Sequence, residues 1–199
     1  MDKRVVAAFD FDGTITYNDT LLPFLMTTVG PVAAIGNFSR VLPSLMAYSL
    51  GLIGRQRAKE ACLAAFYAGM PHAEFEDLGR RFSLEKLDQR IRPESRERIA
   101  WHRNRGDQMV VVSASIETYL KAWAEKEGFA AVLGSRLEVI DGKVTGKLLG
   151  KNCREDEKVR RLEEFLGPRD GYTLYAYGNS DGDKQMLAFA DYAFYKKMS

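Results

Sequence analysis

Two aspartates at the end of an apolar run are the residues of this chain whose types and spacing best suit chemistry. Asp10 and Asp12 follow residues 5–9, Val-Val-Ala-Ala-Phe, a run long enough to form one buried strand. Alternate residues of a strand face opposite sides, so Asp10 and Asp12 share a side while Phe11 points toward the core. Gly13 then allows a tight turn. Two carboxylates this close need a cation or a proton between them.

Two more predicted strands end in polar residues. Residues 109–112 form an apolar run typical of a buried parallel strand, and Ser113 stands at its end. A strand over residues 173–177 leads into Gly-Asn-Ser-Asp-Gly-Asp at residues 178–183. In open α/β sheets, function concentrates at such strand ends.

A lysine lies in a charged, amphipathic segment between these strands. Residues 154–166 predict a helix that carries Lys158. The side chains expected to face inward are Val159, Leu162, Phe165 and Leu166. A lysine on so charged a helix is most often solvated, so position alone does not give Lys158 a role.

Four stretches together resemble a known family. Asp-Phe-Asp-Gly-Thr at residues 10–14, then Ser113, then Lys158, then residues 178–183 match, in order, the four motifs of the haloacid dehalogenase superfamily of phosphotransferases. The match covers nearly the whole chain. It most resembles the phosphoserine phosphatase branch, subfamily IB, which implies a phosphatase that acts through an aspartyl-phosphate intermediate.

The resemblance implies a role for each motif residue. Asp10 is the expected nucleophile, and Asp12 the acid that protonates the leaving alcohol and then the base that activates water. Ser113 and nearby backbone amides, including that of Ala114, are expected to bind the phosphoryl oxygens. Lys158 is expected to neutralise charge in the transition state and to contact the substrate phosphoryl group.

The implied cofactor is Mg²⁺, which prefers hard oxygen ligands and a substrate phosphate. The family's ligands correspond here to the Asp10 carboxylate, the carbonyl of Asp12 and a residue of the fourth motif. In this chain Asn179 stands where many relatives have aspartate, which removes one negative charge. Asp183 is then expected to bind the metal directly or through water, or to anchor Asn179 or Lys158. Asp181 is the alternative if the loop register differs.

Strand and helix patterns alternate through most of the chain, which predicts an α/β protein with a Rossmann-like parallel sheet. We expect residues 1–15 and 96–199 to form this core domain. Residues 16–95 read as an inserted, all-helical cap domain of the kind that selects substrates in the resembled branch. Asp141-Gly142 predicts a hairpin between two short strands.

The cap begins with an unusually apolar stretch. Residues 20–39 contain no charged side chain, but Pro23, Gly30, Pro31 and Gly36 interrupt them, so packed helices are favoured over a membrane span. A second interpretation is an apolar surface that contacts lipid or an acyl-chain substrate, with peripheral membrane contact.

Composition excludes several classes of protein. The chain has 199 residues, and 29 basic against 27 acidic side chains give a net charge of +2, which argues against a nucleic-acid binder. Cys62 and Cys153 form neither a disulfide scaffold nor a zinc motif. The N-terminal residues leave no room for a secretory signal, so a cytoplasmic setting is expected.

The leading hypothesis is a magnesium-dependent phosphatase that hydrolyses a small phosphorylated metabolite. The apolar cap favours an alternative substrate, a lipid phosphate such as phosphatidylglycerophosphate or lysophosphatidate. Asn179 motivates an alternative of another class, a non-catalytic binding protein that keeps the scaffold but not the metal.

Overall fold

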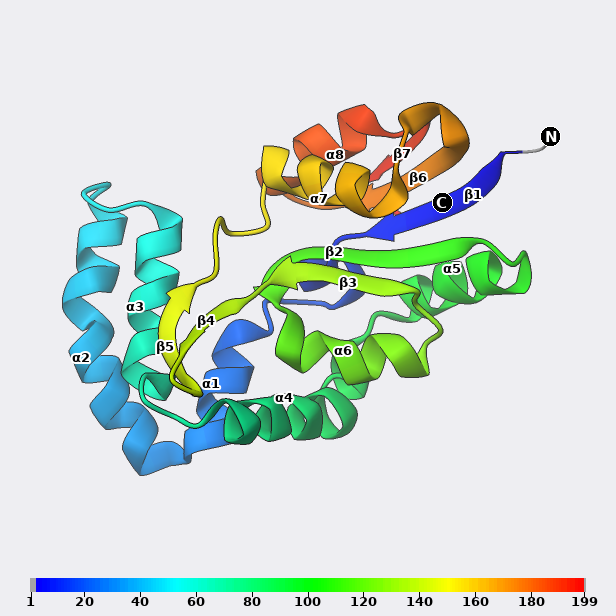
Figure 1. Ribbon diagram of the computed structural model, residues 1–199. Coiled ribbons are helices and arrows are strands. Elements are labelled where there is room, and N and C mark those ends of the chain that lie inside the picture. Colours follow the sequence, from blue (N-terminus) through cyan, green and yellow to red (C-terminus); the bar gives the residue numbers. More distant parts are fainter. Residues whose placement is uncertain (1–2, 199) are drawn as a thin grey trace.

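The computed structural model describes residues 3–198, and its centre is a parallel sheet of five strands (Figure 1). The strands follow the spatial order β3-β2-β1-β6-β7. Their bounds are Arg4–Phe9 (β1), Gln108–Ile116 (β2), Ala131–Ser135 (β3), Tyr172–Gly178 (β6) and Tyr192–Tyr195 (β7). Phe9 pairs with Val111 on one side and Tyr177 on the other, so the end of β1 lies between the middle of β2 and the end of β6. The predicted Rossmann-like sheet is confirmed.

Helices cover both faces of this sheet (Figure 1). On one face lie α5 (Pro93–Asn104) and α6 (Glu117–Lys126), and on the other α7 (Asp156–Leu166) and α8 (Lys184–Phe189). Alternate side chains of β1 therefore enter two separate cores, Ala7 and Phe9 one, Val6 and Ala8 the other, and none of these four is exposed. This burial fixes β1 and the aspartates that follow it.

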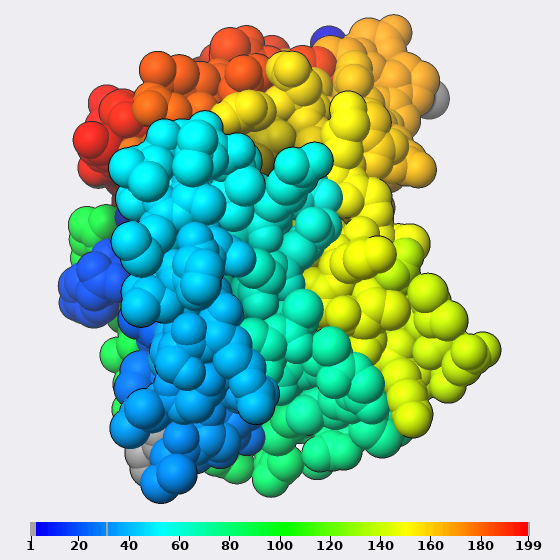
Figure 2. Space-filling model, turned by 90° about the vertical axis from the view of Figure 1, so that its left-hand side faces the viewer, coloured from blue at the N-terminus to red at the C-terminus, as the bar shows by residue number. Residues whose placement is uncertain are grey.

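The segment predicted to be helical forms four helices. They are α1 (Leu21–Val29), α2 (Pro31–Ser49), α3 (Arg55–Tyr67) and α4 (His72–Lys86). Figure 2 looks onto the outer side of this group, where α2 and α3 form much of the surface. No helix within residues 3–198 is long and apolar enough to cross a membrane.

Two contacts join the inserted helices to the sheet. The chain leaves and re-enters the core at Thr16 and Ile91, which form an antiparallel bridge. Helix α4 packs along α6, where the hydroxyl of Ser83 accepts a 2.8 Å hydrogen bond from the backbone N–H of Trp123. The inserted helices are thereby held against the core at both ends.

The predicted hairpin is present as β4 (Leu137–Ile140) and β5 (Lys143–Leu148), an antiparallel pair that packs against α3. Asp141 and Gly142 at its turn both have positive φ, as the Asp-Gly signal predicts. Short helical turns occupy Phe11–Ile15, Asp88–Arg90, Arg169–Gly171 and Asp181–Asp183.

Two local expectations differ from the structure. Strand β2 does not end at residue 112 but continues to Ile116, and its ladder with β3 shifts register between Val112 and Ile116. The prediction that Phe165 faces inward is wrong, because 39% of its surface is exposed. Leu162 and Leu166 are buried as expected, whereas Phe165 lies at the margin of the buried stripe of α7.

Candidate active site

Asp10 directly follows β1 and lies in a buried network of charges. Its backbone N–H donates a 2.9 Å hydrogen bond to the carbonyl of Tyr177, which extends the pairing of β1 with β6. Its carboxylate accepts from the Lys158 ammonium at 2.7 Å on Oδ1 and from the Thr14 hydroxyl at 2.9 Å on Oδ2. Burial raises the pKa of Asp10, and the charge of Lys158 opposes that shift. The carboxylate is therefore fixed in one orientation.

Lys158 is the cation between two carboxylates. It comes from the first turn of α7, is 2% exposed, and donates from Nζ to Oδ1 of Asp183 at 2.6 Å as well as to Asp10. Burial alone would lower its pKa, but the two carboxylates together raise it, so Lys158 keeps its proton at neutral pH. The structure thus brings together Asp10, Lys158 and Asp183, which are far apart in the sequence.

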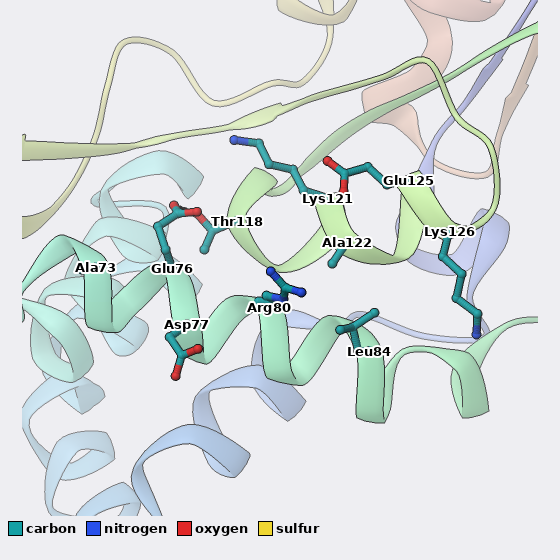
Figure 3. A pocket seen from close by; sticks show the side chains of 10 residues that line it. All are labelled: Ala73, Glu76, Asp77, Arg80, Leu84, Thr118, Lys121, Ala122, Glu125 and Lys126. Carbon is teal, nitrogen blue, oxygen red and sulfur yellow. Dashed lines mark hydrogen bonds between the residues drawn. The ribbon is translucent and has the colours of Figure 1, made fainter.

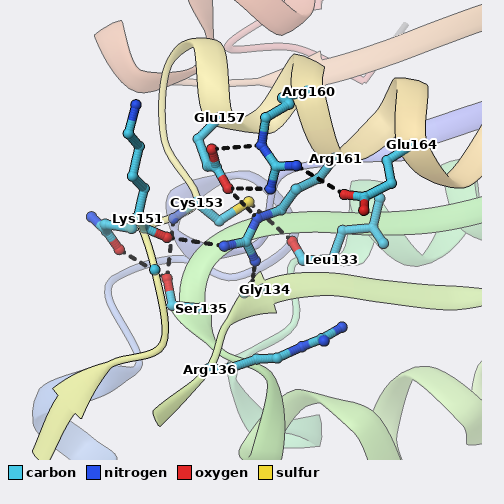
Figure 4. A network of polar contacts seen from close by, with 12 residues as sticks. Leu133, Gly134, Ser135, Arg136, Lys151, Cys153, Glu157, Arg160, Arg161 and Glu164 are labelled. Atoms are coloured by element: carbon cyan, nitrogen blue, oxygen red, sulfur yellow. Dashed lines mark hydrogen bonds and ion pairs between the residues drawn. The ribbon is translucent and has the colours of Figure 1, made fainter. Parts of the chain in front are cut away.

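An ionic network fixes the turn of α7 that carries this lysine (Figure 4). Glu157 accepts hydrogen bonds from Arg160 at 2.8 and 2.9 Å and from Arg161 at 2.8 Å. Arg161 also donates to the carbonyl of Gly134 at the end of β3. Hydrogen bonds from Arg160, and then those from Arg161, hold the pKa of Glu157 down at about 2. The helix is therefore anchored to the sheet edge beside the site.

Asp12 has a different environment, although it lies only two residues from Asp10. Its Oδ1 accepts from the backbone N–H of Thr20 at 2.9 Å and from the Thr20 hydroxyl at 2.6 Å, and Oδ2 accepts from the Ser115 hydroxyl. Burial, and next the charge of Asp19, raise the pKa of Asp12 to about 7, against those hydrogen bonds. Asp12 can therefore gain and lose a proton near neutral pH.

Phe11, between the two aspartates, turns away from them as the strand alternation predicted. Its ring is fully buried and meets Trp123 edge to face at 5.2 Å between centroids. This anchor separates the two carboxylates and leaves each with its own partners.

Ser113 and Ala114 lie in the irregular part of β2, beside the end of β1. Ser113 is buried, and its hydroxyl accepts a 3.0 Å hydrogen bond from the backbone N–H of Ser115. The carbonyl of Ala114 accepts from the hydroxyl of Ser135 at 2.8 Å and from the ammonium of Lys59. The predicted phosphoryl-binding residues are thus placed at the same sheet edge as Asp10.

The fourth motif folds around Asp183. Oδ2 of Asp183 accepts from the backbone N–H groups of Asn179 at 3.1 Å and Ser180 at 2.9 Å, and from the Ser180 hydroxyl at 2.9 Å. With Lys158 on Oδ1, both oxygens are engaged, and these partners hold the pKa of Asp183 low although burial opposes them. Gly178 leaves room for this arrangement, because a Cβ there would lie 2.5 Å from that of Asp183.

Asn179 presents a free carbonyl oxygen to the site. Its Oδ1 is buried and, within the described residues, has no hydrogen-bond partner. Its Nδ2 lies against Gly13, where φ is 75° and an added Cβ would approach that nitrogen to 2.2 Å. Asp181, by contrast, is solvent-exposed and pairs with Lys184 at 2.8 Å. Among the fourth-motif residues, Asn179 therefore offers the available oxygen.

These donors suit a hard divalent cation. The Asp10 carboxylate, the Asp12 carbonyl and the Asn179 amide oxygen are all oxygen ligands, and an orphaned buried oxygen is costly unless something binds it. From Lys3 to Met198, no three side chains of His, Cys, Asp or Glu gather in an arrangement that could hold a metal ion. The oxygen donors present fit Mg²⁺, which takes few protein ligands.

Several residues that contact the site were absent from the sequence-based prediction. Ser115 could have been found, because it shares a strand side with Ser113. Thr14 lies inside the first motif, and Thr20 at the start of the uncharged stretch. Lys59 gave no signal, since its reach from α3 to β2 depends on how the inserted helices pack.

A groove elsewhere on the surface lies between α4 and α6 (Figure 3). Its lining includes Glu76 and Arg80 from α4 and Thr118, Lys121 and Glu125 from α6. The Thr118 hydroxyl donates to Glu76 at 2.7 Å across it. None of the candidate active-site residues lines this groove, which is a seam between two packed helices.

Comparison with known proteins identifies the family. The profile of the haloacid dehalogenase-like hydrolases matches residues 7–188. The chain therefore belongs to this family, as its four motifs predicted.

Several of the similar proteins within this family are phosphatases. Protein CicA of Caulobacter vibrioides is 36% identical over 195 residues, covering 98% of this chain and 86% of CicA. The histidinol-phosphatase of Neisseria meningitidis serogroup C is 28% identical over 180 residues, covering 88% and 79%. A substrate-bound phosphoserine phosphatase has the same fold, with a TM-score of 0.63 at 20% identity and coverage of 98% and 87%. The predicted phosphatase class and phosphoserine phosphatase-like fold are confirmed.

Proposed function

We propose that the protein is a magnesium-dependent phosphomonoesterase that uses Asp10 as its nucleophile. The observation that carries the proposal is the buried arrangement of Asp10, Lys158 and Asp183 at the carboxyl end of the sheet, with Asp12 beside it at a pKa of about 7. Buried ions add little to stability, so such a group is better explained by catalysis.

In the first step, a carboxylate oxygen of Asp10 attacks phosphorus and forms a new O–P bond, while the ester O–P bond breaks. The leaving alkoxide takes the proton of Asp12, which Thr20 and Ser115 hold in place. In the second step, Asp12 removes a proton from water, the resulting hydroxide attacks phosphorus, and the Asp10 oxygen leaves as carboxylate. The products are the alcohol and inorganic phosphate.

The remaining residues stabilise charge on the phosphoryl group. Lys158 keeps its ammonium in this buried site and neutralises the charge that develops on the phosphoryl oxygens. Ser113 and the backbone amide of Ala114 bind the same oxygens. The Asp10 carboxylate, the Asp12 carbonyl and the Asn179 amide oxygen would hold Mg²⁺, which would supply Lewis-acid stabilisation of charge on the phosphoryl group. Asp183 is a positioning residue that fixes Lys158 and the Asn179 backbone.

For the substrate, we propose a small phosphorylated metabolite chosen by a cap that corresponds to residues 16–95, with the rest of the chain as the core. The proposal draws on the resemblance to phosphoserine phosphatases and on the small phosphorylated alcohols named for relatives. Cys62 and Cys153 are free thiols, in keeping with the proposed cytoplasmic setting.

Phosphate release tests both the reaction and the substrate. Purified protein with Mg²⁺ is assayed on phosphoserine, histidinol phosphate, sugar phosphates, nucleotides and short-chain phospholipid phosphates. At least one strong activity is expected, abolished in Asp10→Asn and by chelation of the metal. Undiminished turnover in Asp10→Asn would overturn the mechanism. Absence of Mg²⁺ binding in calorimetry would instead favour the non-catalytic scaffold motivated by Asn179.

A lipid phosphate is the second candidate, and the surface of α2 favours it. Side chains along α2 and just after it are more than half exposed, namely Val32, Ile35, Leu42, Met46, Leu50 and Leu52. Helix α2 lies on the face of the molecule seen in Figure 2. Arg40 is the one charged residue of α2, and no acidic residue occurs from position 20 to 59. An apolar, cationic face of this kind suits an anionic membrane surface.

Co-sedimentation with vesicles separates the two candidates. Binding to vesicles of phosphatidylcholine with phosphatidylglycerol, but not of phosphatidylcholine alone, is expected if α2 contacts lipid. No binding to either composition would leave the small metabolite as the only proposed substrate.

A further inference from the structure

Helix α3 is fastened to the core along one side. Gln56 accepts a 3.1 Å hydrogen bond from the backbone N–H of Asn152 and donates one of 3.1 Å to the carbonyl of Gly150. One turn later, Glu60 accepts from the backbone N–H of Leu148 at 3.1 Å. These contacts join the inserted helix to the end of β5 and to the segment that follows it. They fix the direction in which Lys59, on the same part of α3, points.

Lys59 points from this helix to the edge of the candidate active site. Its Nζ donates to the carbonyl of Ala114 and, at 3.1 Å, to Oδ1 of Asn152. Oδ1 of Asn152 also accepts from the hydroxyl of Ser135 at 2.9 Å, which fixes the amide. Ala114 directly follows Ser113, so the ammonium lies beside the strand proposed to bind the phosphoryl group.

The ammonium of Lys59 lacks an anionic partner. Both of its hydrogen-bond acceptors are neutral, and it forms no ion pair with any carboxylate in the part of the chain that the structure describes. Burial lowers its pKa to about 8, while the more distant charges of Asp12 and Asp19 oppose that shift. The value still lies above 7, so Lys59 is charged at neutral pH.

A part-buried cation without a counterion is costly, and an arriving anion would relieve that cost. Lys59 is not fully buried, since part of the residue remains exposed. An ammonium has three N–H donors, and two of them are used, which leaves one for a ligand. Lys158 pairs with two carboxylates, whereas Lys59 pairs with none in the described residues, so its charge is not neutralised by an ion pair.

We propose that Lys59, held by Asn152, forms a subsite for a second anionic group of the substrate, a carboxylate or another phosphate close to the ester being hydrolysed. This inference rests on the proposed function, because it places the phosphoryl group between Asp10 and Ser113. It narrows the substrate class to phosphomonoesters that carry a second anionic group, over those whose only charge is on the phosphoryl group. In this proposal, α3 is the helix of the cap that contacts the substrate.

The test compares phosphomonoesters that differ in one group. 3-Phosphoglycerate has a carboxylate where glycerol 3-phosphate has a hydroxymethyl group, so the pair isolates the second charge. Wild-type protein is expected to hydrolyse 3-phosphoglycerate with a kcat/KM about tenfold to a hundredfold higher, the value of one charge-assisted hydrogen bond. Lys59→Met should abolish the preference, and Lys59→Arg should retain most of it.

A second pair, fructose 1,6-bisphosphate and fructose 6-phosphate, distinguishes the two anions. If Lys59 is needed for faster hydrolysis of 3-phosphoglycerate, the subsite binds a carboxylate. If Lys59 is needed for faster hydrolysis of fructose 1,6-bisphosphate, the subsite binds a phosphate. If neither pair shows such a preference, the subsite does not exist.

Two controls separate recognition from structure. Lys126→Met removes an exposed lysine of α6 and should change neither ratio. If Lys59 merely fastens α3 to the core, Lys59→Met will slow all four substrates and p-nitrophenyl phosphate by the same factor, which contradicts the proposal.

Binding by an inactive protein keeps this test separate from the proposed reaction. In Asp10→Asn, calorimetry compares the affinities for 3-phosphoglycerate and fructose 1,6-bisphosphate with those for their less charged counterparts, with and without Lys59→Met. Tighter binding of a more charged ligand that requires Lys59 supports the subsite even if no substrate is ever turned over. Equal affinities within both pairs would overturn it while leaving the hydrolytic mechanism intact.

Discussion

The candidate active site and helix α2 depart from ordinary globular structure in opposite ways. In the core, charged groups are buried and partnered: Lys158 is 2% exposed, and Asp183 1%. On α2, apolar groups are exposed and uncovered: Val32 is 83% exposed, and Ile35 73%. Folding requires neither arrangement, because buried ions and exposed apolar surface are both unfavourable. The two proposals account for these departures, phosphoryl transfer for the buried charges and lipid contact for the exposed apolar side chains of α2.

The largest effect is expected from the nucleophile. Asp10→Asn should lower kcat by about a thousandfold or more, since an amide oxygen is a poor nucleophile for phosphorus. The neutral side chain also leaves Lys158 with a single carboxylate. Phosphate release under saturating substrate measures the loss. The control is the melting temperature, because an unfolded variant would lose activity for another reason. A variant that stays folded and retains more than a tenth of the activity would contradict the mechanism.

Removal of Asp183 should have the largest effect on stability. Asp183→Ala leaves the buried Lys158 with one carboxylate. It also removes the acceptor of the backbone N–H groups of Asn179 and Ser180. A broken buried ion pair typically costs about 3–5 kcal/mol in the free energy of unfolding. Urea denaturation measures the change.

Asp181→Ala is the matched control, because this aspartate of the same motif pairs with Lys184 at the surface. The free energy of unfolding should hardly change in that variant, because solvent screens an exposed ion pair. If both variants lost the same free energy of unfolding, the buried network of Asp183 would contribute no more to stability than a surface ion pair.

The contrast between Asp183 and Asn179 also shows what the sequence could predict. The motif order correctly indicated the sheet, its polar strand ends and the family. It left open which fourth-motif residue offers an oxygen to a metal, because that depends on which side chain the loop backbone already uses. The fourth-motif loop donates to Oδ2 of Asp183, Lys158 donates to Oδ1, and the side-chain oxygen of Asn179 is left without a partner in the described residues.

Lys59 illustrates a second limit of sequence reasoning. Its neighbours along α3 are as polar as many solvated helix residues, and only the packing of α3 against the segment after β5 brings it to Ala114. Phe165 shows the converse error, since helical spacing placed it inside although it lies at the edge of the buried stripe. Periodicity predicts a face of a helix, but not how wide the contact on that face will be.

A smaller, pH-dependent effect is expected from Glu157. Its folded pKa of about 2 lies below the ordinary value of 4.5, so its stabilising contribution is complete above about pH 4.5 and is lost as pH falls toward 2. Glu157→Gln should therefore lower the free energy of unfolding by about 1–3 kcal/mol at pH 7, with the difference from wild type shrinking below pH 4.5.

Urea denaturation between pH 2 and pH 7 measures this difference. Glu164→Gln is the matched control, because Glu164 pairs with the same Arg160 but is 70% exposed, and it should show almost no effect. A Glu157 effect that is constant from pH 7 to pH 2 would rule out an ionic origin.

The smallest effect on stability is expected from variants of α2 and of the residue that follows it. The same variants test the proposed contact with lipid. Ile35→Ser and Leu50→Ser change side chains that are 73% and 71% exposed, so the free energy of unfolding should change by less than about 0.5 kcal/mol. If the helix contacts lipid, the same variants should release the protein from vesicles containing phosphatidylglycerol, because each removes buried apolar area at the membrane surface.

Ile140→Ser, on the hairpin and 55% exposed, is the control that should leave vesicle binding unchanged. A loss of stability above about 1 kcal/mol in Ile35→Ser would instead show that this side chain is covered within the protein itself. The two regions would then differ only in polarity, and the exposed face would no longer point to a partner.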